Sequence, residues 1–186
     1  MSGAPDTSRG VAALYERHAA GWDEDRRHAR PPGESGWIRR FASAAGAGGH
    51  VVDLGCGSGE PIGRDLMAAG LRVTGVDASP ALIALCAQRF PEQEWLVADM
   101  RELALSRQFQ GLVAWHSLFH LTPDDQTRMF PVFARHLAPG EALYHACLAP
   151  AEYQSLLDAH GFVVVDHVVE DESCGGATIW FARRAA

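Results

Sequence analysis

A short apolar run followed by a glycine-rich loop is the feature that most constrains the fold of this chain. Val51-Val52-Asp53-Leu54 has the apolar character of a buried strand, and Gly55-Cys56-Gly57-Ser58-Gly59 follows it directly. Because glycine lacks a Cβ atom, such a loop turns tightly and exposes its backbone N–H groups. Pro61 comes next, and proline is favoured at the first position of a helix. The sequence therefore predicts a strand, a ligand-binding loop and a helix whose N-terminus favours a carboxylate or phosphate.

The central part of the chain continues this alternation of strands and helices. The expected strands cover 50–54, 72–77, 94–98 and 111–115, and the expected helices cover 61–69, 80–89 and 123–137. Such alternation indicates a parallel sheet with helices on both faces. Ser79 and Thr122 are expected helix N-caps, each followed by a proline. Pro131 predicts either a kink in the last of these helices or two shorter helices.

The two ends of the chain have different patterns. Apolar residues recur at helical spacing over about 11–27, and a second helix is expected over 35–45. Near the C-terminus, two β-rich runs at 162–170 and 177–183 are joined by a short loop and predict an antiparallel hairpin. The sheet is therefore expected to be parallel and to finish with an antiparallel pair.

Two acidic residues indicate which kind of ligand the loop holds. A dinucleotide-binding loop has a third glycine three positions after Gly57, but Glu60 stands there. Asp77, which is 22 positions beyond Gly55, ends the second expected strand. An acid at this point can accept hydrogen bonds from the hydroxyls of a ribose. The pattern favours a nucleoside-containing ligand without the pyrophosphate of NAD.

These features resemble class I S-adenosylmethionine-dependent methyltransferases. Asp53 with the glycine loop resembles motif I, Asp99-Met100 resembles the family's adenine site, and the segment 116–121 resembles motif IV. The resemblance implies a three-layer α/β sandwich with a mostly parallel seven-stranded sheet, strand order 3-2-1-4-5-7-6, and a C-terminal antiparallel hairpin. It also implies one domain over 1–186, with a helical lid over 1–46 and a Rossmann-like core over 47–186.

One departure from the family concerns the fifth strand. In the family this strand begins near Pro139-Gly140, and related chains carry an additional stretch before the segment that matches 143–148. Here Glu141 joins the two directly. Either 142–148 serves as the fifth strand, or a strand and its loop are missing and the sheet has a gap.

The resemblance implies S-adenosylmethionine as cofactor, S-adenosylhomocysteine as product and a small molecule with an O, N or S nucleophile as acceptor. The expected cofactor contacts in the core are Asp53, Gly55, Cys56, Gly57, Gly59, Asp77, Ala78, Asp99, Met100, Trp115 and His116. Tyr15 and Trp22 are expected to close over the cofactor from the first helix. The expected acceptor contacts are Ser117, His120, Tyr144 and His145. His116 is also the candidate general base, since imidazole titrates near neutral pH.

Several of these residues are equally consistent with structural roles. Asp53 can organise the glycine loop, and Tyr15 and Trp22 can pack as ordinary surface-helix residues. His116 and His120 have a helical metal-ligand spacing. They follow a strand, however, and no third ligand is evident, so no metal is expected.

Composition limits the partners and the compartment. The 186 residues suffice for one domain, and the net charge of −7 argues against binding to nucleic acid or an anionic membrane. Four cysteines without C-x-x-C pairing, a polar N-terminus and the lack of a membrane-length apolar segment predict a cytoplasmic protein. Two alternatives remain open: a cofactor-binding protein impaired in catalysis, and, more remotely, a NAD-dependent oxidoreductase. The oligomeric state is not predicted.

Overall fold

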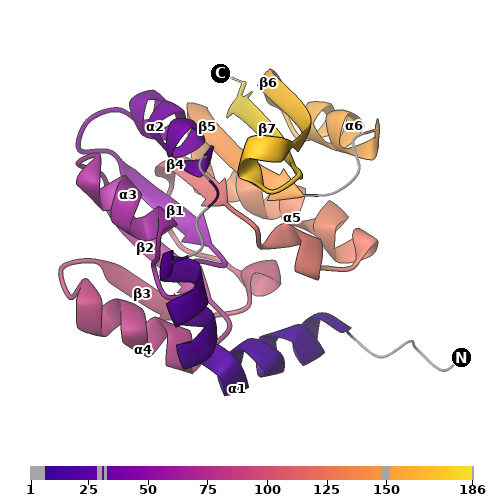
Figure 1. The fold of residues 1–186 in the computed structure, drawn as a ribbon. Helices are drawn as coiled ribbons and strands as arrows, with labels where there is room; N and C mark the ends of the chain where they lie inside the picture. Colours follow the sequence, from indigo (N-terminus) through magenta and orange to yellow (C-terminus); the bar gives the residue numbers. More distant parts are fainter. Residues whose placement is uncertain (1–6, 29–30, 32, 148–150, 186) are drawn as a thin grey trace, which may run out of the picture.

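A seven-stranded sheet forms the centre of the molecule (Figure 1). The computed structural model describes residues 7–28, 31, 33–147 and 151–185. The strands lie in the order β3-β2-β1-β4-β5-β7-β6, which confirms the expected order. Their bounds are β1 His50–Leu54, β2 Arg72–Asp77, β3 Glu94–Val97, β4 Phe109–Ala114, β5 Leu137–Cys147, β6 Phe162–Asp171 and β7 Ala177–Arg184. The first five strands in chain order pair in parallel, and β7 pairs antiparallel with both β5 and β6.

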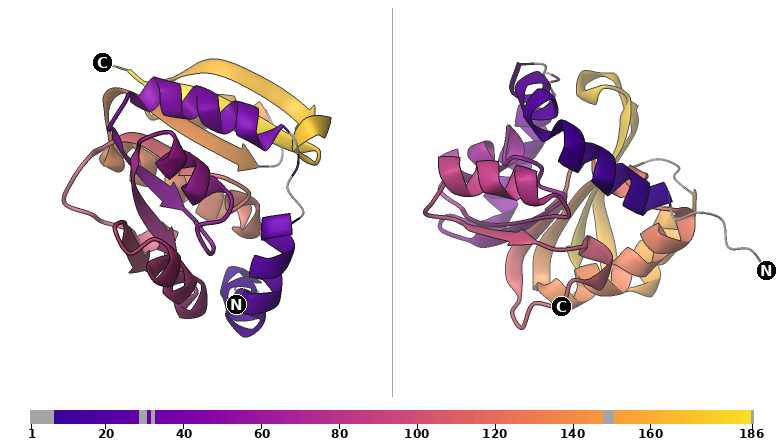
Figure 2. Two further views of the ribbon diagram at one scale, coloured as in Figure 1. Left: turned by 60° about the vertical axis from the view of Figure 1, so that its left-hand side comes forward. Right: turned by 90° about the horizontal axis from the view of Figure 1, so that it is seen from below.

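Helices cover both faces of this sheet. Their bounds are α1 Thr7–His28, α2 Glu34–Ala45, α3 Ile62–Ala68, α4 Pro80–Arg89, α5 Pro123–His136 and α6 Ala151–Ala159, with short 3-10 turns η1 Met100–Glu102, η2 Leu118–His120 and η3 Glu172–Cys174. Apolar side chains of α2 and α3 pack on one face, and those of α5 and α6 pack on the other. Figure 2 shows α2 lying along its face of the sheet beside the C-terminal hairpin.

Local sequence signals account for the starts of α4 and α5. Ser79 caps α4 by accepting a hydrogen bond from the Leu82 N–H, and Thr122 caps α5 in the same way through the Asp125 N–H. α5 runs as a single helix through Pro131, whereas α1 bends at His18. Pro61 precedes α3 instead of starting it, and α3 has only seven residues.

The segment after Gly140 forms a complete fifth strand. Ala142 lies opposite Gly111 of β4 on one side and opposite Arg183 of β7 on the other. The pairing continues to His145 with β4 and to Cys147 with β7. Of the two possibilities for this region, the first is confirmed: the sheet is continuous between β4 and β7.

Within the described residues, no helix has the combination of length and apolar character needed to cross a membrane.

Candidate active site

A cavity lies at the carboxyl ends of β1, β2 and β4, and residues of α1 form part of its lining. Its empty volume is about 800 Å³, including the part that opens to solvent. The lining residues are Val11, Ala12, Tyr15, Trp22, Gly55, Gly57, Asp77, Ala78, Leu82, Ala98, Asp99, Met100, Arg101, His116, Ser117, His120 and Leu121. This position is where open α/β sheets bind their ligands.

The glycine loop presents bare backbone to this cavity. Gly55 and Gly57 have φ values of +74° and +57°, a conformation that other residues adopt at a cost of about 1–2 kcal/mol. A Cβ atom on Gly55 would lie 2.3 Å from the Ser117 Cβ, and one on Gly57 would lie 2.5 Å from the Trp22 ring. Gly59 differs, because its missing Cβ points toward Phe90 and Trp95. The loop therefore forms a cradle at Gly55 and Gly57 in which no side chain fits.

Asp77 joins the glycine loop to the end of β2. One carboxylate oxygen accepts a 2.9 Å hydrogen bond from the Gly57 N–H, and the other accepts a 2.9 Å bond from the Ser79 N–H. Burial raises the pKa of Asp77, although these backbone hydrogen bonds oppose the effect. A carboxylate oxygen can accept two hydrogen bonds, so Asp77, which lines the cavity, retains acceptor capacity for a ligand.

Asp53 lies beneath the loop and does not line the cavity. Its side chain is buried, and its Oδ2 atom has no hydrogen-bond partner among the described residues. Burial, followed by the nearby charge of Asp77, raises the pKa of Asp53 to about 7. This geometry fits a residue that supports the loop from below.

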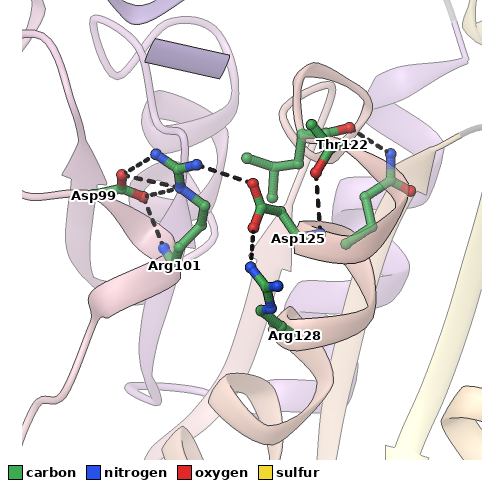
Figure 3. Close-up of polar contacts among 7 residues, drawn as sticks. Asp99, Arg101, Thr122, Asp125 and Arg128 are labelled. Carbon is green, nitrogen blue, oxygen red and sulfur yellow. Dashed lines mark hydrogen bonds and ion pairs between the residues drawn. The ribbon is translucent and has the colours of Figure 1, made fainter. Parts of the chain in front are cut away.

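Asp99 is engaged by Arg101, a residue that no sequence motif indicated. The Arg101 backbone N–H and guanidinium donate to both Asp99 oxygens at 2.6–3.0 Å (Figure 3). Arg101 also donates to Asp125 at 2.9 Å, and Asp125 accepts a 2.9 Å bond from Arg128. Asp99, which lines the cavity, therefore belongs to a network of ion pairs that connects η1 to α5.

Two aromatic side chains of α1 face the cavity. The Tyr15 hydroxyl lies 3.0 Å from the His120 Nε2 atom, and its ring meets the Trp22 ring edge-on at 5.5 Å. Glu16 fixes the helix to the start of α4 by accepting hydrogen bonds from the Ser79 hydroxyl at 2.5 Å and the Ala81 N–H at 3.0 Å. Tyr15 and Trp22 are therefore held over the loop by contacts between elements.

His116 stands against a buried carboxylate. Its Nε2 atom lies 3.3 Å from Glu34 Oε1, and the same oxygen accepts hydrogen bonds from Arg26 at 2.6 Å and from Trp115 Nε1 at 2.9 Å. Burial acts to raise the pKa of Glu34, but the His116, Arg26 and Trp115 donors outweigh it and lower this pKa to about 2. Glu34 is thus an anion in the protein interior. As a helix-start glutamate far from the motifs, it gave no local signal of this role.

Most of the expected site residues line the cavity, but not all of them do. Ser117 and His120 face it, and the Ser117 hydroxyl donates to the Leu54 carbonyl at 2.7 Å. Tyr144, expected to contact the acceptor, is instead fully buried and stacks on Trp115 with 5.4 Å between ring centroids. The other expected contacts that do not line the cavity are Asp53, Cys56, Gly59 and Trp115.

The side chain of His145 lies outside the described residues, so its expected acceptor contact stays a prediction. The described side chains include no group of three or more His, Cys, Asp or Glu residues arranged to hold a metal.

Comparisons with known proteins agree with this architecture. Residues 51–140 match the model of a family described as a methyltransferase domain. Cypemycin N-terminal methyltransferase from Streptomyces sp is 36% identical over 108 residues, covering 56% of this chain and 44% of that protein. Trans-aconitate 2-methyltransferase from Azoarcus sp. (strain BH72) is 35% identical over 94 residues, covering 50% and 36%. The chain therefore spans less than half the length of these two relatives.

A solved structure shows the same fold over nearly the whole chain. N-methyltransferase NodS from Bradyrhizobium japonicum WM9, in complex with S-adenosylhomocysteine, has a TM-score of 0.79 at 20% identity, covering 97% of this chain and 100% of that one. The sheet order and the cavity define a Rossmann-like methyltransferase fold. Over residues 51–140 the chain is similar to the methyltransferase-domain family, and its fold is that of the class I S-adenosylmethionine-dependent methyltransferases.

Proposed function

We propose that this chain binds S-adenosylmethionine in the cavity and transfers its methyl group to a small-molecule acceptor. The observation that carries the proposal is the junction of the glycine cradle and Asp77, where the carboxylate accepts the Gly57 N–H at 2.9 Å inside the cavity. Backbone free of side chains suits the methionyl part of the cofactor, and an acid at the tip of β2 suits its ribose. The cofactor supplies a methyl group already activated by the positive charge on sulfur.

The remaining cavity residues fit the adenosyl end of this ligand. Ala78, Leu82 and Met100 offer apolar surface for adenine, and Asp99 lines the same cavity. Because the Asp99 oxygens already accept hydrogen bonds from Arg101, the exocyclic amine of adenine would share this carboxylate with the guanidinium. Tyr15 and Trp22 would cover the cofactor from α1, where aromatic rings attract a sulfonium by about 0.5–2 kcal/mol.

The acceptor is proposed to lie beside η2, against His116, Ser117 and His120. These side chains line the same cavity as the glycine cradle. Holding the donor and acceptor in line in an enclosed site can lower the barrier by about 7–11 kcal/mol, because the cost of bringing them together is already met on binding. The net charge of −7 supports an acceptor of this class, as do the relatives named for methylation of trans-aconitate and of a dTDP-linked amino sugar.

The alternative of a catalytically impaired protein loses its main support. It depended on a strand missing after Gly140, but β5 pairs along both edges and closes the sheet.

Calorimetry with S-adenosylhomocysteine tests the proposed cofactor site. Asp77→Ala removes the carboxylate from the ribose position, and we expect the affinity to fall about ten- to hundredfold, as for the loss of charge-assisted hydrogen bonds. Asp124→Asn, at an exposed position of α5, is the matched control and should retain the wild-type affinity. Equal affinities in the Asp77→Ala variant and the wild type would contradict the ribose assignment, and a wild type that does not bind would contradict the proposal itself.

A further inference from the structure

We propose that Glu34 is a positioning residue that holds His116 as the base for an acceptor whose nucleophile carries a proton, either an ammonium or a hydroxyl group. This inference rests on the proposed methyl transfer. It assigns a role in the reaction to Glu34, which lies outside the motifs described above, and it limits the acceptor to amines and hydroxyl compounds. The carboxylate acts through His116 and is not itself expected to contact the acceptor.

The first observation is the concentration of donors on one buried oxygen. Glu34 is fully buried at the start of α2, and its Oε1 atom meets Arg26 from α1, Trp115 from the end of β4 and His116. A buried carboxylate costs several kcal/mol unless donors compensate it. Side chains from α1 and from the segment that follows β4 therefore converge on Glu34 of α2, which fixes the orientation of the imidazole that faces it.

The second observation is the backbone conformation of His116. Its φ of +50° lies in the left-handed region, which costs a residue with a Cβ about 1–2 kcal/mol. Such a conformation persists only where surrounding contacts over-determine it, and it occurs preferentially at functional sites. Here the 3.3 Å contact with Glu34 provides that constraint, while 30% of the His116 side chain stays exposed toward the cavity.

The orientation assigns different roles to the two ring nitrogens. With Nε2 facing Glu34, the Nδ1 atom is left to take a proton from the acceptor. In the reaction, the acceptor N–H or O–H bond breaks and its proton passes to Nδ1. The electron pair of the nucleophile forms the new bond to the methyl carbon, and the electrons of the broken C–S bond remain on sulfur. The resulting imidazolium would donate from Nε2 to the Glu34 carboxylate.

Other charges near His116 shape this arrangement. Arg26 keeps Glu34 ionised from the side of α1, and His120 of η2 lies on the cavity side. Burial, followed by the charge of His116, lowers the pKa of His120. His120 therefore favours its neutral form and does not compete with His116 for the proton taken from the acceptor.

The acceptor class follows from the need for a base. A carboxylate is deprotonated at neutral pH and attacks without one, whereas an ammonium or a hydroxyl group must lose a proton. A histidine base oriented by a buried glutamate therefore helps the methylation of an ammonium or hydroxyl group and does not help that of a carboxylate. We therefore expect this chain to methylate amines or hydroxyl compounds and to leave carboxylic acids such as trans-aconitate unmodified.

The test compares Glu34→Gln and Glu34→Asp with Glu92→Gln, a change at an exposed glutamate after α4. Each variant is measured by calorimetry with S-adenosylhomocysteine, by NMR of the His116 ring tautomers, and by activity on a panel of amines, phenols and trans-aconitate. We expect cofactor affinity within about threefold of wild type in all variants. In Glu34→Gln the His116 ring should populate its two neutral tautomers more evenly, because a neutral amide oxygen is a weaker acceptor for the Nε2 proton than a carboxylate.

The kcat on the accepted compounds should fall about tenfold or more in Glu34→Gln with KM little changed, and Glu34→Asp should recover part of it. An unchanged His116 tautomer ratio, an unchanged kcat, or methylation of trans-aconitate alone would overturn the inference. If Glu34→Gln does not fold, Glu34→Asp is compared with wild type instead: its shorter side chain should lower kcat by a smaller factor, and an unchanged kcat would overturn the inference. If the wild-type protein does not bind S-adenosylhomocysteine, the result contradicts the proposed function and not the role of Glu34.

Discussion

Asp53 is a carboxyl group enclosed beneath the glycine loop, and its burial makes the stability of the protein depend on pH. Its folded-state pKa is raised to about 7, first by burial and then by the charge of Asp77, whereas an unfolded chain has a value of about 3.9. Between these two values the folded state binds more protons than the unfolded state. The contribution of Asp53 to stability is therefore fully present below about pH 4 and is lost as the pH rises through about 7.

Replacing Asp53 by Asn should remove this pH dependence. The penalty for ionising the buried carboxyl is roughly 4 kcal/mol at most, because a tenfold change in an acid dissociation constant corresponds to about 1.4 kcal/mol. Relative to wild type, the Asp53→Asn variant should gain stability progressively between pH 4 and 8. Urea unfolding at several pH values measures this difference. A difference between variant and wild type that stays constant over this range would show that Asp53 is not protonated in the fold.

At the scale of single residues, the sequence predicted the parts of the site that belong to local motifs. Gly55, Gly57 and Asp77 lie at or just after the ends of strands, so strand geometry alone places them at one edge of the sheet. Glu34 and Arg101 were missed, because their roles depend on partners that other elements bring to them.

At the scale of elements, α1 is attached to the rest of the molecule by polar contacts on α4. The carboxylate of Asp23 is 3% exposed and receives a bidentate ion pair from Arg89, with both N–O distances at 2.5 Å. The Glu16 contacts lie two turns earlier on the same helix. These contacts determine where Tyr15 and Trp22 lie over the cavity.

Arg89→Met should loosen α1, because it leaves the buried Asp23 charge without its main partner. We expect a loss of about 2–4 kcal/mol, somewhat below the usual cost because Arg27 remains 3.4 Å from Asp23. Amide hydrogen exchange in α1 should accelerate, while exchange in the central strands changes less. The double variant Asp23→Asn/Arg89→Met should recover part of the stability. Equal exchange rates for α1 in Arg89→Met and wild type would show that the ion pair does not anchor this helix.

The fifth strand shows how an element can be ambiguous in sequence and definite in structure. From the sequence, the segment that includes residues 142–147 was compatible with two arrangements: it forms the fifth strand, or the fifth strand is missing and the sheet has a gap. Pairing with β4 and β7 on its two edges satisfies the backbone of this segment and selects one position.

At the scale of the whole molecule, the cavity is built from segments that are distant in the sequence. It combines α1, the ends of β1, β2 and β4, and the turns η1 and η2. A ligand that bridges these segments stabilises the folded state as a unit, because the unfolded chain cannot bind it.

Thermal unfolding should therefore distinguish the proposed cofactor from a nicotinamide dinucleotide. At a concentration of about one hundred times its Kd, S-adenosylhomocysteine should stabilise the fold by about 2.7 kcal/mol and raise Tm by roughly 5–10 °C. NADH at the same concentration should leave Tm unchanged within about 1 °C, because Glu60 replaces the glycine that a dinucleotide loop requires. Stabilisation by NADH alone would contradict the methyltransferase assignment.

By itself, the sequence determined the parallel α/β core, the terminal hairpin, the glycine cradle and the acid at the end of β2. Each of these features depends on the pattern of apolar residues, glycines and turn residues within a short stretch of chain. Only the tertiary structure decided that Tyr144 belongs to the core, that Asp99 is shared with Arg101, and that Glu34 meets His116. Such contacts join residues from different elements, and their distances are set by how the helices pack on the sheet.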